Sequence, residues 1–184
     1  KYLVKKLGRI GNMIAFDQIL EKLYRENKAQ VLEYLSQLGG VIIYLTIKYG
    51  KKDRIEAAYF PYIIKKYHLI ANRPLETVIS SMLELLDEPS IYCRENAMQA
   101  LYTTGDSECI IKALKKIDAS ELFFHEKLLA DGLLSFAGDH EELCKKMIES
   151  FRCFTVEMQV ALLNFLRFDS GAYAKFAFEQ LKNE

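Results

Sequence analysis

Histidine and cysteine side chains are the first place to look for chemistry, because they bind metals and act as bases or nucleophiles. His140 and Cys144 are four residues apart, so a helix would place them on one face. They could supply two zinc ligands, but a closed zinc site needs four, and no spacing brings Cys109 or Cys153 to them. A thiol–imidazole pair for catalysis would also need an orienting third group in a cleft. We therefore predict no catalytic residue and no metal ligand.

Motifs that bind cofactors or hold a catalytic serine are missing from the sequence. It contains no G-x-S-x-G, no P-loop and no G-x-G-x-x-G. The glycines of LGRIGN (residues 7–12) follow no expected strand, which disfavours a phosphate-binding loop. We predict no cofactor and a protein that is not an enzyme.

Basic residues recur one repeat apart in the second half of the chain. Those that we predict to contact a partner are Lys112, Lys116, Lys145 and Arg152. We expect the partner to be another protein. As an alternative, the stripe would hold the phosphates of nucleic acid, as in a DNA-repair protein. Nucleic acid is less favoured, because this half of the chain is acidic overall and the sequence has no Trp to stack on a base.

A second cluster combines basic and aromatic residues in the first half of the chain. Its predicted partner-binding residues are Arg54, Tyr59, Tyr62 and Lys66. Tyrosine and arginine are favoured at protein interfaces, and a basic face also suits anionic lipid. Tyrosines at helical spacing more often belong to the core, because the ring buries readily. The sequence leaves these interpretations open.

Length and composition fit one folded domain. The 184 residues are enough for a sizeable core, and 51% of them are hydrophobic and 27% charged. The four cysteines include no C-x-x-C pair, so we expect buried or partly buried thiols in a reducing compartment. No apolar run in the sequence approaches the roughly 20 residues that span a bilayer.

Charge is unevenly distributed, although the net charge is zero. Residues 1–73 hold 14 Lys/Arg and 6 Asp/Glu, whereas residues 74–184 hold 11 Lys/Arg and 19 Asp/Glu. This asymmetry bears on partners or orientation rather than on the fold.

The elements that position these residues are predicted to be helical hairpins. In residues 97–117, apolar residues recur with the three-four spacing of amphipathic helices on both sides of a Thr-Thr-Gly-Asp turn. Gly105 suits the left-handed residue that ends the first helix, and Asp106 can cap the second. Similar turns are expected about 32–33 residues apart, at Gly138 and Ser170–Gly171 and, working backwards, at residues 72–74. Residues 39–40 and 11–12 continue the series. Turns at one period indicate a repeat array.

We predict an all-α fold, a right-handed α-α superhelix of about five to six hairpins, in a single domain over residues 1–184. Helices are expected at 12–25, 27–38, 40–49, 52–67, 74–87, 90–103, 106–117, 120–136, 139–151, 155–168 and 171–182. The helix at 12–25 is expected to be the second helix of a partial unit, 1–25. The remaining helices are expected to pair in chain order into the units 27–49, 52–87, 90–117, 120–151 and 155–182. Pro61 is expected to kink or indent its helix.

The repeats resemble HEAT-type repeats, including the short bacterial variety. The likeness is carried by SIYCRENAMQALYTTGDSECIIKALKKID and FFHEKLLADGLLSFAGDHEELCKKMIESF. Both contain a small residue in the first helix (Ala97, Ala130), a Gly-Asp turn and a Leu/Ile-rich second helix. The resemblance covers the last three units well and the N-terminal third weakly. It implies a solenoid that binds partners in its inner groove, and therefore a non-enzymatic protein–protein interaction scaffold or adaptor.

Two further likenesses concern localisation and metal binding. YLVKKLGRIGNMIAFDQILEKL and AAYFPYIIKKY resemble bacterial HEAT-repeat proteins with an N-terminal membrane anchor. This implies an anchor ahead of Lys1 and a cytoplasmic protein held on the inner face of the membrane. Some HEAT-type hydroxylases bind two irons through His-Glu pairs repeated in several first helices, but here only His125-Glu126 stands at such a position. One pair does not make a two-metal site.

Overall fold

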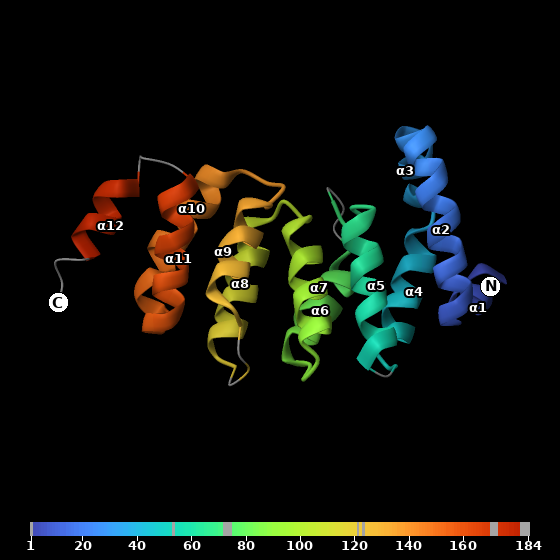
Figure 1. The fold of residues 1–184 in the computed structure, drawn as a ribbon, viewed down its shortest axis with the longest axis horizontal. Coiled ribbons are helices and arrows are strands. Elements are labelled where there is room, and N and C mark those ends of the chain that lie inside the picture. Colours follow the sequence, from blue (N-terminus) through green and yellow to red (C-terminus); the bar gives the residue numbers. More distant parts are fainter. Residues whose placement is uncertain are drawn as a thin grey trace. The chain divides into compact units, whose positions relative to one another are not determined.

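The fold is all-α, as predicted. The structure is a computed structural model that describes residues 2–52, 54–71, 75–120, 122, 124–169 and 173–180, without the side chains of Arg54, Phe168, Asp169 and Ala177. These residues form twelve α-helices and two short 3-10 helices and contain no strand (Figure 1). The chain divides into two compact units, 1–101 and 102–184.

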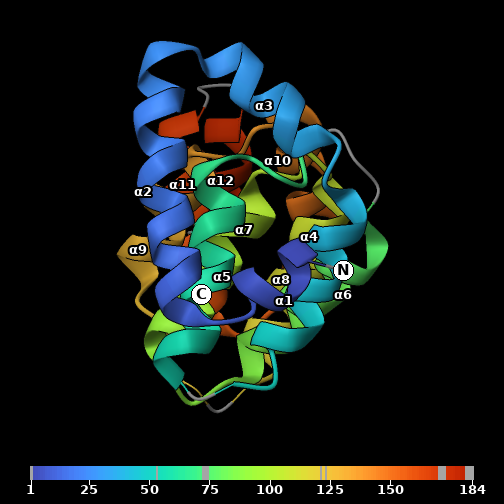
Figure 2. The same cartoon turned by 90° about the vertical axis from the view of Figure 1, so that its right-hand side faces the viewer.

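Unit 1 is built from two layers of helices. Its elements are α1 (Tyr2–Leu7), α2 (Ile10–Glu26), α3 (Lys28–Ser36), α4 (Gly39–Tyr49), α5 (Arg54–Lys66), α6 (Glu76–Glu84), η1 (Leu85–Asp87) and α7 (Ile91–Tyr102), whose last residue belongs to unit 2. Figure 2 shows α2 and α5 on one side of the unit and α4 and α6 on the other. The layers meet where the buried Tyr49 ring of α4 stacks on Phe60 of α5, with 5.4 Å between ring centroids.

Two predicted turns of unit 1 lie elsewhere. Residues 11–12 are inside α2, and the chain breaks at Gly8-Arg9 instead, where Asn12 Nδ2 donates to Lys6 O at 2.9 Å. Residues 39–40 begin α4, and the break lies just before them, at residues 37–38. A glycine inside a helix costs only about 1 kcal/mol relative to alanine, so it does not by itself end the helix. The turn predicted at 72–74 lies outside the described residues.

The pairing of the first helices also differs from the prediction. α4 packs against α6, as expected for the second helices of successive units. We expected 12–25 to be a second helix as well, but α2 lies beside α5. The contact that decides this is made by Asp17, a buried residue whose partners lie more than forty positions later. α5 runs through Pro61, and Asn96 Nδ2 of α7 donates to the carbonyl of Ala58 within the preceding turn, at 3.0 Å.

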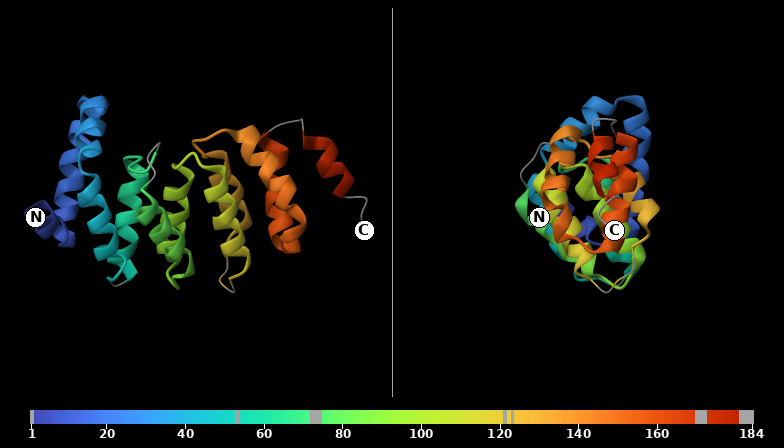
Figure 3. Two further views of the ribbon diagram at one scale, coloured as in Figure 1. Left: turned by 180° about the vertical axis from the view of Figure 1, so that it is seen from behind. Right: turned by 90° about the vertical axis from the view of Figure 1, so that its left-hand side faces the viewer.

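Unit 2 also has two layers. Its elements are α8 (Ser107–Asp118), α9 (Glu126–Leu134), α10 (His140–Ser150), η2 (Phe151–Cys153), α11 (Val156–Asp169) and α12 (Ala174–Gln180). α9 packs against α11 and α8 packs against α10, and Figures 1 and 3, which view the molecule from opposite sides, show these pairs as two layers. The helix predicted over 120–136 is shorter, because α9 begins only at Glu126. The turn predicted at Ser170–Gly171 lies outside the described residues.

The Gly-Asp turns of unit 2 follow the prediction. Gly105 has φ +71°, a left-handed conformation that glycine adopts without steric cost. Asp106 Oδ1 accepts from Glu108 N at 2.9 Å and so caps α8. Asp139 Oδ1 accepts from Glu141 N at the same distance and caps α10. One local sequence therefore starts two helices in the same way.

The two Gly-Asp turns lie against each other. Ala137 N donates to Tyr102 O at 3.0 Å, which joins the second turn to the first. A Cβ atom on Gly138 would stand 2.4 Å from Gly105 O, and one on Gly132 would stand 2.5 Å from Cε2 of the buried Tyr102. Both distances are too short for carbon, so these glycines are required for close packing between successive hairpins.

One pair of helices has the apolar content of a membrane span. Among the described residues no single helix is long and apolar enough to cross a bilayer. α3 and α4 reach that content only together, and they are bent by 77° at the break between them.

The Gly138 contact makes a prediction about stability. Gly138→Ala should lower the free energy of unfolding by about 1 to 3 kcal/mol, because the added methyl group meets backbone that cannot move aside. Gly40→Ala is the control, since a Cβ at Gly40 has no neighbour within 4 Å and alanine favours the helix. Urea unfolding followed by circular dichroism measures both, and equal stability of the two variants would contradict the close contact.

Candidate functional site

The predicted aromatic and basic residues of α5 converge on a buried carboxylate of α2. Asp17 is only 6% exposed. Its Oδ1 accepts from Lys66 Nζ at 2.8 Å and from the Tyr67 hydroxyl at 2.7 Å. Its Oδ2 accepts from the Tyr59 hydroxyl at 3.0 Å, and Glu21 accepts from Lys66 Nζ at 3.1 Å. Tyr59 and Lys66, which were named from the sequence, and Tyr67, which directly follows α5, thus share one internal partner.

The aromatic ring of Tyr62 also lies close to the Lys66 ammonium. The Lys66 ammonium lies 5.4 Å from the ring centroids of both Tyr62 and Tyr67, within the range of cation–π attraction. Tyr59 and Tyr62 also line a small open hollow with Ile55, Ala58 and Asn96. The side chain of Arg54, the fourth predicted residue of this set, lies outside the described part of the chain.

The electrostatics of this cluster oppose chemical reactivity. Burial works against the charge of Lys66, but hydrogen bonds to Asp17 and Glu21 outweigh it and raise the pKa of the ammonium. Burial, together with the hydrogen bond to Asp17, raises the pKa of Tyr59 and of Tyr67. At neutral pH the lysine is therefore a fixed cation, which can act neither as a nucleophile nor as a base. The cluster holds α2 against α5.

The predicted basic residues of unit 2 lie on its α8/α10 side. Lys112 and Lys116 are on α8, Lys145 is on α10 and Arg152 is in η2. All are exposed except Lys116, which is half-buried. The structure thus places the three lysines on one pair of helices, as expected from their spacing, and Arg152 in the 3-10 turn that follows α10.

Acidic residues interrupt this basic surface. Lys146 of α10 pairs with Glu108 of α8, and its Nζ lies 3.7 Å from Glu142 Oε1. The hydrogen bond with Lys146 lowers the pKa of Glu108, and the same bond raises the pKa of Lys146. The surface is therefore mixed in charge, which suits a continuous polyanion less well than a uniformly basic stripe would.

The histidines weighed as metal ligands have local structural contacts. His125 precedes α9, and its Nδ1 accepts from Lys127 N at 3.2 Å. His140 Nε2 lies 3.0 Å from Phe136 O, and its ring packs 5.8 Å from that of Phe136. In the part of the chain that the structure describes, no three His, Cys, Asp or Glu side chains lie close enough together to hold a metal ion.

The four cysteines form no disulfide. Cys93, Cys109 and Cys144 are buried as predicted, and burial raises the pKa of Cys109 to about 11. Cys153 is exposed, which differs from the prediction. Cys153 is the last residue of η2, and the buried positions are taken by Phe151, which begins η2, and Phe154, which follows it.

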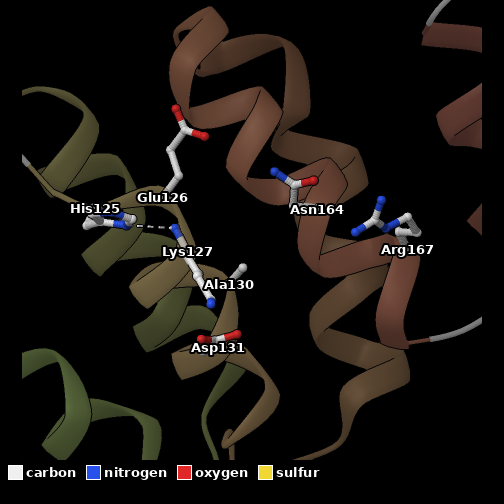
Figure 4. A pocket seen from close by; sticks show the side chains of 7 residues that line it. All are labelled: His125, Glu126, Lys127, Ala130, Asp131, Asn164 and Arg167. Carbon is white, nitrogen blue, oxygen red and sulfur yellow. Dashed lines mark hydrogen bonds between the residues drawn. The ribbon is translucent and has the colours of Figure 1, made fainter.

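A groove between α9 and α11 is the strongest candidate site of unit 2. Its wider pocket has a volume of about 450 Å3 and is lined by His125, Glu126, Lys127, Ala130, Asp131, Asn164 and Arg167. Figure 4 shows Asn164 and Arg167 on α11 facing the residues at the start of α9 across the groove. The buried Ala130 has a small side chain, which leaves room between the helices. The rim carries both signs of charge.

A second pocket adjoins the first, since Glu126 lines both. It has a volume of about 320 Å3 and is lined by Ile117, Asp118, Ser120, Leu122, Phe124, Glu126, Leu129, Thr155, Glu157, Met158 and Ala161. Most of these side chains are apolar, and the charged ones are all acidic. Asp118 is fixed in place, because its Oδ2 accepts from Thr155 N at 2.9 Å and its other oxygen accepts from the Thr155 hydroxyl.

The residues of unit 2 that were named from the sequence lie on α8, α10 and η2, and none of them lines the α9/α11 groove. On this side of unit 2 large apolar side chains are exposed, namely Leu128, Leu134, Val156 and Val160. None is exposed among the described residues of α8 and α10. The sequence of α11, VEMQVALLNFLRFD, could have indicated this surface. Its apolar residues extend around the helix beyond the single face that an amphipathic helix buries.

Comparison of the chain with protein-family models, with curated proteins and with solved structures finds no match.

The Asp17–Lys66 contact can be tested by removing the cation. Lys66→Met should lower the free energy of unfolding by about 3 kcal/mol, because Asp17 would stay buried without its partner. Adding Asp17→Asn should recover part of that loss, since a neutral amide needs no cation. Lys65→Met, on an exposed neighbour, should change stability by less than about 0.5 kcal/mol. Urea denaturation measures all three, and similar losses for both lysine variants would refute the pairing.

The raised pKa values predict that unit 1 is sensitive to alkali. Burial raises the pKa of Tyr49 from 10.0 to about 12, and those of Tyr59, Tyr67 and Lys66 are also raised. Each of these groups holds its proton more tightly in the folded protein than in the unfolded chain. This difference stabilises the fold fully at pH values below the pKa of the unfolded chain, and the stabilisation is lost as the pH rises through the pKa of the folded protein. Stability should therefore fall between about pH 10 and pH 12. Thermal unfolding midpoints measured across this interval test it, and a flat profile contradicts it.

Proposed function

We propose that this chain is a non-enzymatic protein-interaction scaffold or adaptor, built from stacked helical hairpins of the HEAT type in a right-handed superhelix. Support for the architecture comes from the two-layered packing within each unit and from two Gly-Asp turns that cap α8 and α10 identically. In such arrays each hairpin buries its apolar faces against its neighbours, and the remaining surface is extended and available for binding.

The observation that carries the proposal is the groove between α9 and α11. Its two adjoining pockets, of about 450 and 320 Å3, combine apolar walls with a polar rim. Recognition of peptide segments by helical proteins commonly uses an apolar groove between helices, with polar groups that orient the segment. A segment of another protein fits this groove, because its apolar side chains would pack against the apolar walls and its polar groups would contact the polar residues at the rim.

The proposed contact surface differs from the one expected from the sequence. The lysines of α8 and α10 alternate with acids, whereas apolar side chains are exposed on α9 and α11. Apolar burial supplies most of the free energy of protein association, and charges at the edge mainly affect the rate. The partner is therefore expected on α9 and α11, and nucleic acid held by Lys112 and Lys145 is the weaker alternative.

A site-specific crosslinker tests this proposal. A photoreactive amino acid placed at Asn164, in the groove, should give discrete protein adducts in cells of the source organism. Lys145, exposed on α10, is the matched control position and should give few. Reversing two rim charges, with Lys127→Glu and Arg167→Glu, should reduce the Asn164 adducts. Equal adduct yields at Asn164 and Lys145 would rule out the groove as the binding site.

A further inference from the structure

We propose that the smaller pocket of the groove receives an arginine side chain of the partner, an inference that rests on the proposed protein-binding function. The pocket lies where α9 and α11 begin and α8 ends. Its volume of about 320 Å3 exceeds that of one amino-acid side chain, so a residue of a bound segment can enter. The chemistry of the lining decides which residue enters.

The pocket walls suit an aliphatic stem. Ile117, Leu129, Met158 and Ala161 line the pocket and are buried in the chain. A side chain that reaches the acidic groups must pass along these apolar surfaces. Arginine and lysine do so readily, because their methylene stems cover apolar surface while the charged end stays at a polar rim.

The charges of the pocket favour a cation. Glu126 and Glu157 are exposed at the pocket and form no ion pair with any described residue. Asp118 adds a third carboxylate, and no basic side chain is among the described residues of the lining. The N-terminal ends of α9 and α11 offset part of this charge, but each amounts to only about half a positive charge. The net charge of the pocket lining is therefore still negative.

Arginine fits this arrangement better than lysine or a metal ion. A guanidinium is planar and has donors on several edges, so it can form paired hydrogen bonds to a carboxylate of the lining while its face lies against the apolar wall. An ammonium is more strongly hydrated and gains less from an apolar wall. Among the described residues no metal-binding group is assembled, because the carboxylates are not gathered closely enough.

Methionine methyl NMR of the full chain provides the test. The chain has five methionines, and Met158 lines this pocket while Met147 lies on α10. The probe is Nα-acetyl-arginine methylamide, and its neutral isostere is the corresponding citrulline compound. We expect a saturable shift of the Met158 signal with a dissociation constant in the millimolar range, as for a ligand of this size. The Met147 signal should not move, and the citrulline compound should bind at least about tenfold more weakly.

Paired variants separate charge from folding. Glu126→Gln with Glu157→Gln should weaken binding of the arginine probe at least about tenfold, because both acceptors lose their charge. Glu141→Gln with Glu142→Gln is the matched control, since these first-turn acids of α10 lie outside the pocket and the affinity should be unchanged.

The arginine inference is overturned by any of three results: no saturable Met158 shift, equal binding of the citrulline compound, or unchanged affinity of the Glu126/Glu157 variant. None of these results affects the adducts formed from Asn164. Adducts at Asn164 without arginine binding would mean that the groove holds a partner of other chemistry.

Discussion

The close approach of two turns is the constraint on which unit 2 depends. Gly138 lies against Gly105 O so closely that no side chain fits between them, and Ala137 N donates to Tyr102 O across the same contact. Because these are backbone contacts, the distance between successive hairpins has little freedom. The hairpin that begins with α9 is therefore placed relative to α8, and the start of α9 forms a pocket with the end of α8 and the start of α11.

Unit 1 joins its helices through a polar contact instead. Asp17 of α2 is held by Tyr59 and Lys66 of α5 and by Tyr67, which directly follows that helix. A buried ion pair contributes little net stability, because both charges lose water, but it penalises any packing that leaves Asp17 unpaired. Its main effect is to select one position of α2 beside α5. Residues that would otherwise be available for a partner are used for this internal contact.

The two layers of unit 2 have different surfaces. The α8/α10 side exposes lysines and acids that pair with each other, as Lys146 does with Glu108. The α9/α11 side exposes large apolar side chains beside pockets whose walls include Ala130 and Ala161. Small residues at a contact between helices leave volume that longer side chains would fill. This combination of exposed apolar surface and free volume is what favours a protein partner on α9 and α11.

The sequence by itself determined the features that depend on near neighbours. Helical periodicity located nearly all the helices, and the conformation of Gly105 and the caps by Asp106 and Asp139 follow from the residue types within one turn. Tertiary structure decided the burial of Asp17, the tight contact at Gly138 and the shared pocket of Glu126 and Glu157. Each of these joins residues about thirty or more positions apart, and the helical period that predicts an element does not say which other element it will meet.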